Sequence, residues 1–206
     1  MNDFIEKFKL DIDEYIYLDD QEHEELLNKI LNYANNNQGS FVKDVISIPL
    51  DEDVIIVSMI LEALIKDSKT WGDFIVEYLK LIISKIKQEE SPKQFVYHII
   101  DFEIITFDKS SLVQKTADIL YEEIDTQIIE IKNAIILTLM SFIDHENIKN
   151  RQSIIDKIQQ QLNYNDYKVR LFTYNELKRN SLLPKNYQLT FKDKLNKLLF
   201  GTPSVF

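Results

Sequence analysis

The chain has 206 residues, enough for one well-buried domain or at most two small ones, and 45% of them are hydrophobic. The absence of cysteine excludes disulfides, thiolate metal sites and thiol nucleophiles, while three glycines and four prolines are too few for a loop-rich all-β protein. The net charge of −10 is the sum of −10 over residues 1–53, −7 over 54–148 and +7 over 149–206, an acidic majority that argues against nucleic acid as partner.

The N-terminal quarter predicts two amphipathic helices and a short third one. Apolar side chains recur three and four positions apart over residues 3–18 and again over residues 20–34, where acidic residues occupy the first turn. The Asn-rich run at 35–39 predicts the end of the second helix, because Asn and Gly tolerate the left-handed conformation of a helix end. Ser40 is expected to cap a short helix that ends before Pro49. The acidic start lacks the basic and apolar regions of a secretory signal, so we expect a cytoplasmic protein.

From residue 51 onward the pattern predicts eight helices with short connections. We expect them at residues 51–67, 71–88, 92–107, 110–123, 126–143, 148–163, 165–180 and 190–199. Side chains suited to N-cap positions are Asp51, Ser91 before Pro92, Ser110, Asp125 and Thr190, the last with Asp193 three residues on. The longest charge-free stretch, residues 133–143, is shorter than the ~20 residues that a membrane-spanning helix needs and predicts a core helix.

Four of these helices contain an internal repeat. Nine-residue segments that begin at Ile56, Val96, Ile131 and Val169 superpose, and their starts lie 40, 35 and 38 residues apart. The period resembles that of HEAT-like helix pairs, whose first helix often opens with Asp-x-x-Val-Arg, and residues 166–170 (Asp-Tyr-Lys-Val-Arg) match this opening. The other three segments have no Arg at that place, and two of the four lack the Asp. An irregular helical bundle with a chance spacing is the alternative.

The resemblance implies an all-α fold of stacked antiparallel helix pairs, a short α-solenoid with capping helices at both ends. Residues 1–50 would form an acidic N-terminal cap, residues 51–180 the HEAT-like pairs and residues 181–200 the C-terminal capping helix. These parts would make a single domain over residues 1–200, followed by a flexible tail at 201–206. Caps are needed because an end pair has no neighbour to bury its apolar face.

No residue pattern indicates catalysis. The three histidines, His23, His98 and His145, lack the spacing of helix-borne zinc or di-iron sites, and His98 is expected in the core. Ser84 opens a Ser-x-x-Lys sequence, but the companion motifs of penicillin-recognising enzymes are missing. Three scattered glycines cannot build a phosphate-binding loop. We therefore expect no catalytic residue, no metal and no cofactor, and the chain is predicted not to be an enzyme.

Aromatic residues are expected mainly in the core. Trp71 opens a helix and is predicted to pack inside rather than to anchor a partner. Aromatic and basic residues mix near the C-terminal end, as they do in proteins that bind single-stranded nucleic acid. The mixed set is Tyr164, Tyr167, Phe172 and Tyr174 with Lys168, Arg170, Lys178 and Arg179. Because these aromatics fall largely on the stripe predicted to be buried, core packing is the favoured explanation.

The most unusual local feature is an acid-rich stretch near the N-terminus. It is a candidate surface for a cationic protein, with two tyrosines at its edge as amphipathic anchors. The candidate partner-binding residues are Asp11, Asp13, Glu14, Tyr15, Tyr17, Asp19, Asp20, Glu22, Glu24 and Glu25. A solvated turn between two helices is the alternative explanation.

Together these features predict a non-catalytic protein-binding domain. The Asn-, Ile- and Lys-rich composition is common in AT-rich bacterial genomes, and the chain is similar, in general character rather than in any motif, to bacterial toxin-neutralising immunity proteins. We expect an immunity or inhibitor protein that covers the active surface of a basic toxin or nuclease, with neither nucleic acid nor membrane as partner. A scaffold or adaptor in a larger assembly is the alternative.

Overall fold

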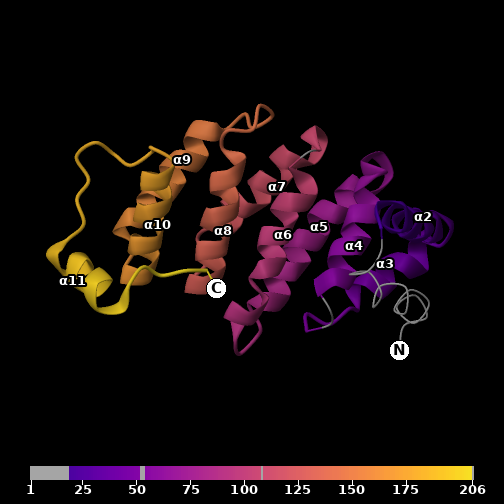
Figure 1. Cartoon of the computed structure of the whole chain (residues 1–206), viewed down its shortest axis with the longest axis horizontal. Helices are drawn as coiled ribbons and strands as arrows, with labels where there is room; N and C mark the ends of the chain where they lie inside the picture. Colours follow the sequence, from indigo (N-terminus) through magenta and orange to yellow (C-terminus); the bar gives the residue numbers. More distant parts are fainter. Residues whose placement is uncertain (1–18, 52–53, 108, 206) are drawn as a thin grey trace. The chain divides into compact units, whose positions relative to one another are not determined.

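The computed structural model describes residues 19–51, 54–107 and 109–205, which form helices joined by turns with no strand among them (Figure 1). The predicted all-α class is confirmed. The chain falls into two compact units, residues 1–85 and 86–206, and each is described by itself. None of the helices in the described ranges combines the length and the apolar character that a membrane crossing requires.

The first unit is built on α2, which packs against α3 and α4. Its described helices are α2 (Asp20–Asn36), α3 (Gln38–Ile46), α4 (Val54–Ile65) and α5 (Ser68–Ile86), the last of which ends at the unit boundary. Trp71 of α5 is buried, its ring meets the edge of Phe41 at a centroid distance of 5.4 Å, and its indole N–H donates to the side chain of Asn35 at 2.7 Å. The prediction that Trp71 is a core residue is therefore confirmed.

Local hydrogen bonds explain why two helices of this unit begin earlier than predicted. The side chain of Asp67 accepts the backbone N–H of Thr70 at 3.2 Å, so α5 begins at Ser68 instead of residue 71. Asn37 ends α2 with a φ of −131°, outside the left-handed region, and its carbonyl accepts the backbone N–H of Phe41 at 2.9 Å, so it also stands at the N-cap of α3. Ser40 consequently lies inside α3, and the prediction that it caps this helix is wrong.

The second unit is built around α8, which contacts α6, α7 and α10; Figure 1 shows α6, α8 and α10 side by side. Its elements are the 3₁₀ helices η2 (Pro92–Phe95) and η3 (Gln161–Asn163) with α6 (Tyr97–Thr106), α7 (Ser110–Glu123), α8 (Ile129–Phe142), α9 (Arg151–Gln160), α10 (Tyr167–Arg179) and α11 (Phe191–Phe200). Nearly every residue of α8 after Glu130 is buried, which confirms the core helix predicted from the charge-free stretch.

The four repeat segments lie in α4, α6, α8 and α10, with Val96, the first residue of the second segment, at the N-cap of α6. The first and the fourth position of the segment are buried in every copy. The residues at the first position are Ile56, Val96, Ile131 and Val169, and those at the fourth position are Met59, Ile99, Ala134 and Phe172. The four helices therefore share the same buried stripe, as the superposition of the segments predicts.

The predicted N-caps have mixed outcomes. Thr190 caps α11, since its hydroxyl accepts the backbone N–H of Asp193 at 3.1 Å. Ser91 stands at the N-cap of η2 but makes no capping hydrogen bond. The predictions for Ser110 and Asp125 are wrong: Ser110 is the first residue inside α7, and Asp125 lies ahead of the α8 N-cap and pairs with a lysine instead. Asp51 adjoins residues outside the description, and its capping role stays a prediction.

Candidate functional site

Half of the predicted acidic surface lies in the described part of the chain. Five of its carboxylates, all exposed, occupy the start of α2: Asp19, Asp20, Glu22, Glu24 and Glu25. The other five candidates, Asp11, Asp13, Glu14, Tyr15 and Tyr17, lie outside the described residues, as does the helix predicted at 3–18. The structure thus places five of the ten candidates at the N-cap and in the first two turns of α2.

Two of these carboxylates have a structural role that the partner hypothesis did not include. Asp19 is the N-cap of α2, and its side chain accepts the backbone N–H groups of Gln21 and Glu22 at 2.9 Å each. The Glu22 side chain reaches back to the backbone N–H of Asp19 at 3.1 Å, which completes a capping box. The Asp-x-x-Glu spacing is visible in the sequence and is the signal that would have revealed this role.

The remaining three carboxylates differ in their ion-pair and hydrogen-bond partners. Glu24 pairs with Lys66, the residue after the end of α4, and the hydrogen bond from that ammonium lowers the pKa of the Glu24 carboxyl. Glu25 accepts a hydrogen bond from the Gln21 amide at 2.9 Å. Asp20 has no polar side-chain partner among the described residues. The negative surface that a basic protein would meet therefore rests mostly on Asp20 and Glu25.

A second surface, which the sequence did not single out, lies on α11. Four of its five apolar side chains fall on one helical face and point to solvent, with Phe191 and Leu198 more than four-fifths exposed, while Phe200 lies on the opposite face. The four members of that face are Phe191, Leu195, Leu198 and Leu199, and we call them the α11 face. The opposite side of the helix, which meets α10, instead carries the fully buried carboxylate of Asp193. The helix is amphipathic with its apolar side outward.

An ion pair holds α11 in this orientation. The guanidinium of Arg170 donates to both oxygens of Asp193, from Nε at 3.1 Å and from Nη2 at 2.6 Å. Arg170 also donates to the backbone carbonyls of Tyr164 and Asn165 at 2.6 and 2.7 Å, which fixes the guanidinium on α10. The hydrogen bond from Arg170 lowers the pKa of the Asp193 carboxyl, and Asp193 raises the pKa of Arg170 in turn.

The α11 face is bordered by positive charge. Lys192 and Lys194 flank it on the helix, both are exposed, and neither has an ion-pair or hydrogen-bond partner in the described ranges. Lys197 lies on the other side, where its ammonium approaches the side-chain oxygen of Asn175 at 3.4 Å. The local electrostatics therefore favour an acidic partner over a basic one.

The aromatic and basic residues near α10 do not form one cluster. Phe172 is buried and Arg170 is committed to Asp193, whereas Tyr164, Tyr167 and Tyr174 are half-buried. Of the histidines, His98 is buried in α6, as predicted. No group of three or more His, Asp or Glu side chains within the described ranges is placed to hold a metal ion.

Comparisons with known proteins leave the family open. No protein-family model matches the sequence, and searches of curated proteins and of solved structures find no match. The HEAT-like repeat and the likeness to immunity proteins stay predictions.

Proposed function

We propose that the chain is a non-catalytic protein-binding domain. The observation that carries the proposal is the outward-facing apolar side of α11. Contiguous exposed apolar surface with a polar border marks interaction sites in soluble proteins, because burying it against a partner stabilises a complex by about 25 cal/mol per Å². The buried Arg170–Asp193 pair supports this interpretation, since it holds the helix with its apolar residues away from the body of the unit.

The partner at the α11 face would be a protein with an apolar groove and carboxylates at its edge. A ten-residue helix with anchors at the spacing of Phe191, Leu195 and Leu198 suits a groove that accepts one helical face. The unpaired ammonium groups of Lys192 and Lys194 would meet the carboxylates.

Replacement of Leu198 by Asp tests this proposal. Leu198 is 82% exposed, so the substitution should leave the folding of the unit unchanged while placing an uncompensated charge in the contact. Chemical cross-linking in the native cells, followed by affinity purification, should recover a partner with the wild type and lose it with Leu198→Asp. Lys185→Asp, an exposed change on the connection before α11, is the matched control and should retain the partner.

The Leu198→Asp variant also distinguishes two other possible occupants of the α11 face, a second copy of the chain and a membrane surface. A wild type that sediments as a dimer while Leu198→Asp sediments as a monomer would assign the α11 face to self-association. Flotation of the wild type with vesicles rich in phosphatidylserine, lost in the variant, would assign it to a membrane surface. Either result would contradict a protein partner of different sequence.

The more specific hypothesis is an immunity or inhibitor protein that neutralises a basic toxin or nuclease through the acidic surface of α2. The exposed carboxylates of Asp20 and Glu25 support it, because they add negative potential where few basic residues offset it. Reversal of both to Lys should slow association with a basic toxin encoded by a neighbouring gene, most strongly at low salt. Asp144→Lys, an exposed reversal in the second unit, is the control. An association rate unaffected by salt would count against the acidic-surface mechanism.

A scaffold or adaptor is the alternative function, and the presence of one candidate surface in each unit favours it. Unit 1 carries the acidic surface and unit 2 the α11 face, so two partners of opposite charge could be held by one chain. HEAT-like stacking of helix pairs would suit this role, and the shared buried stripe of α4, α6, α8 and α10 supports such stacking. Recovery of both partners in one complex would favour the adaptor, whereas mutually exclusive binding would favour the inhibitor.

A further inference from the structure

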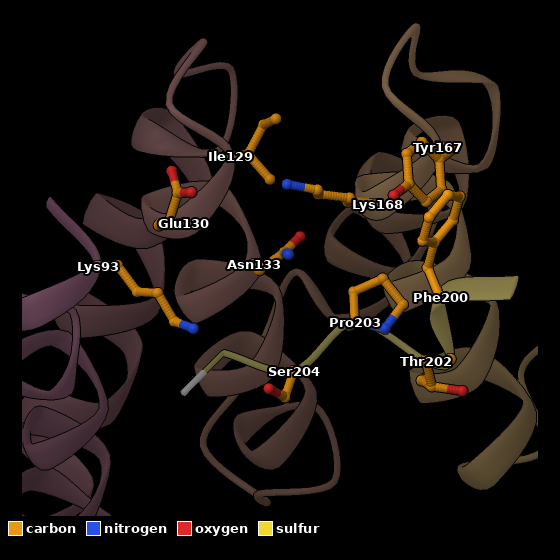
Figure 2. A pocket seen from close by; sticks show the side chains of 11 residues that line it. Lys93, Ile129, Glu130, Asn133, Tyr167, Lys168, Phe200, Thr202, Pro203 and Ser204 are labelled. Carbon is orange, nitrogen blue, oxygen red and sulfur yellow. The ribbon is translucent and has the colours of Figure 1, made fainter. Parts of the chain in front are cut away.

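A cavity of about 350 Å³ lies in the second unit beside the C-terminal tail (Figure 2). It is lined by Lys93 of η2, the first two turns of α8, the first turn of α10 and residues 200–204. Gly201 has a positive φ of 75°, which turns the chain after α11 so that the tail forms one wall, and Val205 beyond it is buried. The volume lies within the range of about 300–1,000 Å³ that is usual for small-molecule sites.

A buried amide without a partner lines the cavity. Asn133 of α8 is 3% exposed, and its side-chain oxygen has no hydrogen-bond partner among the described residues. Ile136, three residues further along the same face of α8, is fully buried and apolar, so packing alone would favour an apolar side chain at this position. An unpaired buried amide lowers stability, and a ligand that donates an N–H to it would offset that loss.

Two lysines without partners line the same cavity. In Figure 2 Lys93 and Lys168 extend from opposite sides, with Asn133 between them. Neither ammonium has an ion-pair or hydrogen-bond partner in the described part of the chain. Lys87 and Lys157 of the same unit, by contrast, each pair with a carboxylate. Two unpaired ammonium groups around a buried amide are suited to a carboxylate with a neighbouring N–H group.

The other walls limit the ligand further. The rings of Tyr167 and Phe200 lie 6.3 Å apart between centroids and provide an aromatic wall. Glu130 also lines the cavity, and its negative charge disfavours polyanions such as nucleoside polyphosphates while it can accept a second N–H. A ligand with a single negative charge and one aromatic or branched apolar group is therefore complementary to all sides of the cavity.

We infer that this cavity binds an organic carboxylate that carries an amide N–H and an aromatic or branched apolar group, held by Lys93, Lys168 and Asn133 against Tyr167 and Phe200. An N-acyl amino acid has this chemistry, and so does the last residue of a peptide chain. The inference goes beyond the proposed function, since the cavity is built by residues outside the α11 face and can bind its ligand whether or not a protein docks there.

The test is calorimetric titration of the full chain with N-acetyl-L-phenylalanine. We expect saturable binding with a dissociation constant on the order of 1 mM or lower. N-acetyl-L-phenylalaninamide, which lacks the carboxylate, should bind at least about tenfold more weakly, because a hydrogen bond to a charged group contributes at least that factor. A hexapeptide ending in Phe with a free carboxylate separates the two sources: tighter binding than the acyl amino acid assigns a peptide end, and weaker binding assigns the free compound.

Three variants and one control connect the binding to these residues. Lys93→Gln and Lys168→Gln, both at exposed positions, should each weaken binding by about tenfold without changing the fold. Asn133→Leu should unfold at a higher temperature than the wild type, because the unpaired amide is removed, and should also weaken binding by about tenfold. Lys178→Gln on the same helix as Lys168 lies outside the cavity and should bind like the wild type.

Three results would overturn the inference. One is an absence of saturable binding for both free carboxylates up to about 10 mM, well above the expected affinity. The second is equal binding of the amide-capped probe, and the third is unchanged affinity in both lysine variants. The Lys93→Gln and Lys168→Gln variants test the binding inference even if Asn133→Leu fails to fold.

Discussion

The ion pair between Arg170 and Asp193 should decide whether α11 stays docked on α10. Replacement of Asp193 by Asn keeps the shape of the side chain and removes its charge. Loss of one partner from a buried ion pair costs about 3–5 kcal/mol. The Arg170 side chain is 16% exposed and keeps its bonds to two backbone carbonyls, so we expect a smaller cost of about 2 kcal/mol.

Amide hydrogen exchange of residues 191–200 measures this cost directly. Because α11 contacts the unit mainly through α10, the loss should appear as local undocking rather than global unfolding. A cost of about 2 kcal/mol corresponds to exchange about 30-fold faster across α11. Asp144→Asn is the matched control, since Asp144 is 77% exposed in its pair with Arg151 and should change stability by less than about 0.5 kcal/mol.

The same pair predicts a pH dependence. Because the pKa of Asp193 is lowered in the folded chain, its contribution is complete above the unfolded value of about 3.9 and is lost as the pH falls through the lower folded value. Wild-type α11 should therefore lose protection in acid, whereas Asp193→Asn should show no such step. Identical exchange of α11 in both proteins at neutral pH would refute the anchoring role of the pair.

Four further substitutions have measurable consequences. Burial raises the pKa of Tyr78 to about 12, so the free energy of unfolding measured in denaturant titrations should fall by about 2 kcal/mol between pH 10 and 12. Tyr78→Phe should abolish this decrease. Burial lowers the pKa of Lys132, so wild-type stability should rise with pH up to about 10.4, a rise that Lys132→Met removes. Lys85 donates to two carbonyls at the end of α3, and Lys85→Met should cost about 1–3 kcal/mol in the urea-induced unfolding of unit 1. Gly201→Ala should strain the tail by about 1–3 kcal/mol and raise the exchange rate of the Val205 amide while the rest of the unit is unchanged.

Most helices could be predicted from the sequence because hydrophobic periodicity is a local property. The buried stripe of α8 and the N-cap at Thr190 are clear in the order of residues. Helix starts were less predictable, as a single side chain such as that of Asp67 can extend a helix by a few residues. The capping box at Asp19 was also legible, but the abundance of acids around it favoured a partner-binding interpretation.

The tertiary structure alone decided which way α11 faces and what surrounds Asn133. Periodicity states which residues share a helical face, but it cannot state whether that face meets protein or solvent. That choice depends on Arg170 and Asp193, which are 23 residues apart and meet only because α11 packs on α10. The cavity depends on η2, α8, α10 and the C-terminal tail, which are distant in the sequence. The unpaired amide of Asn133 indicates a binding site only because these segments leave space beside it.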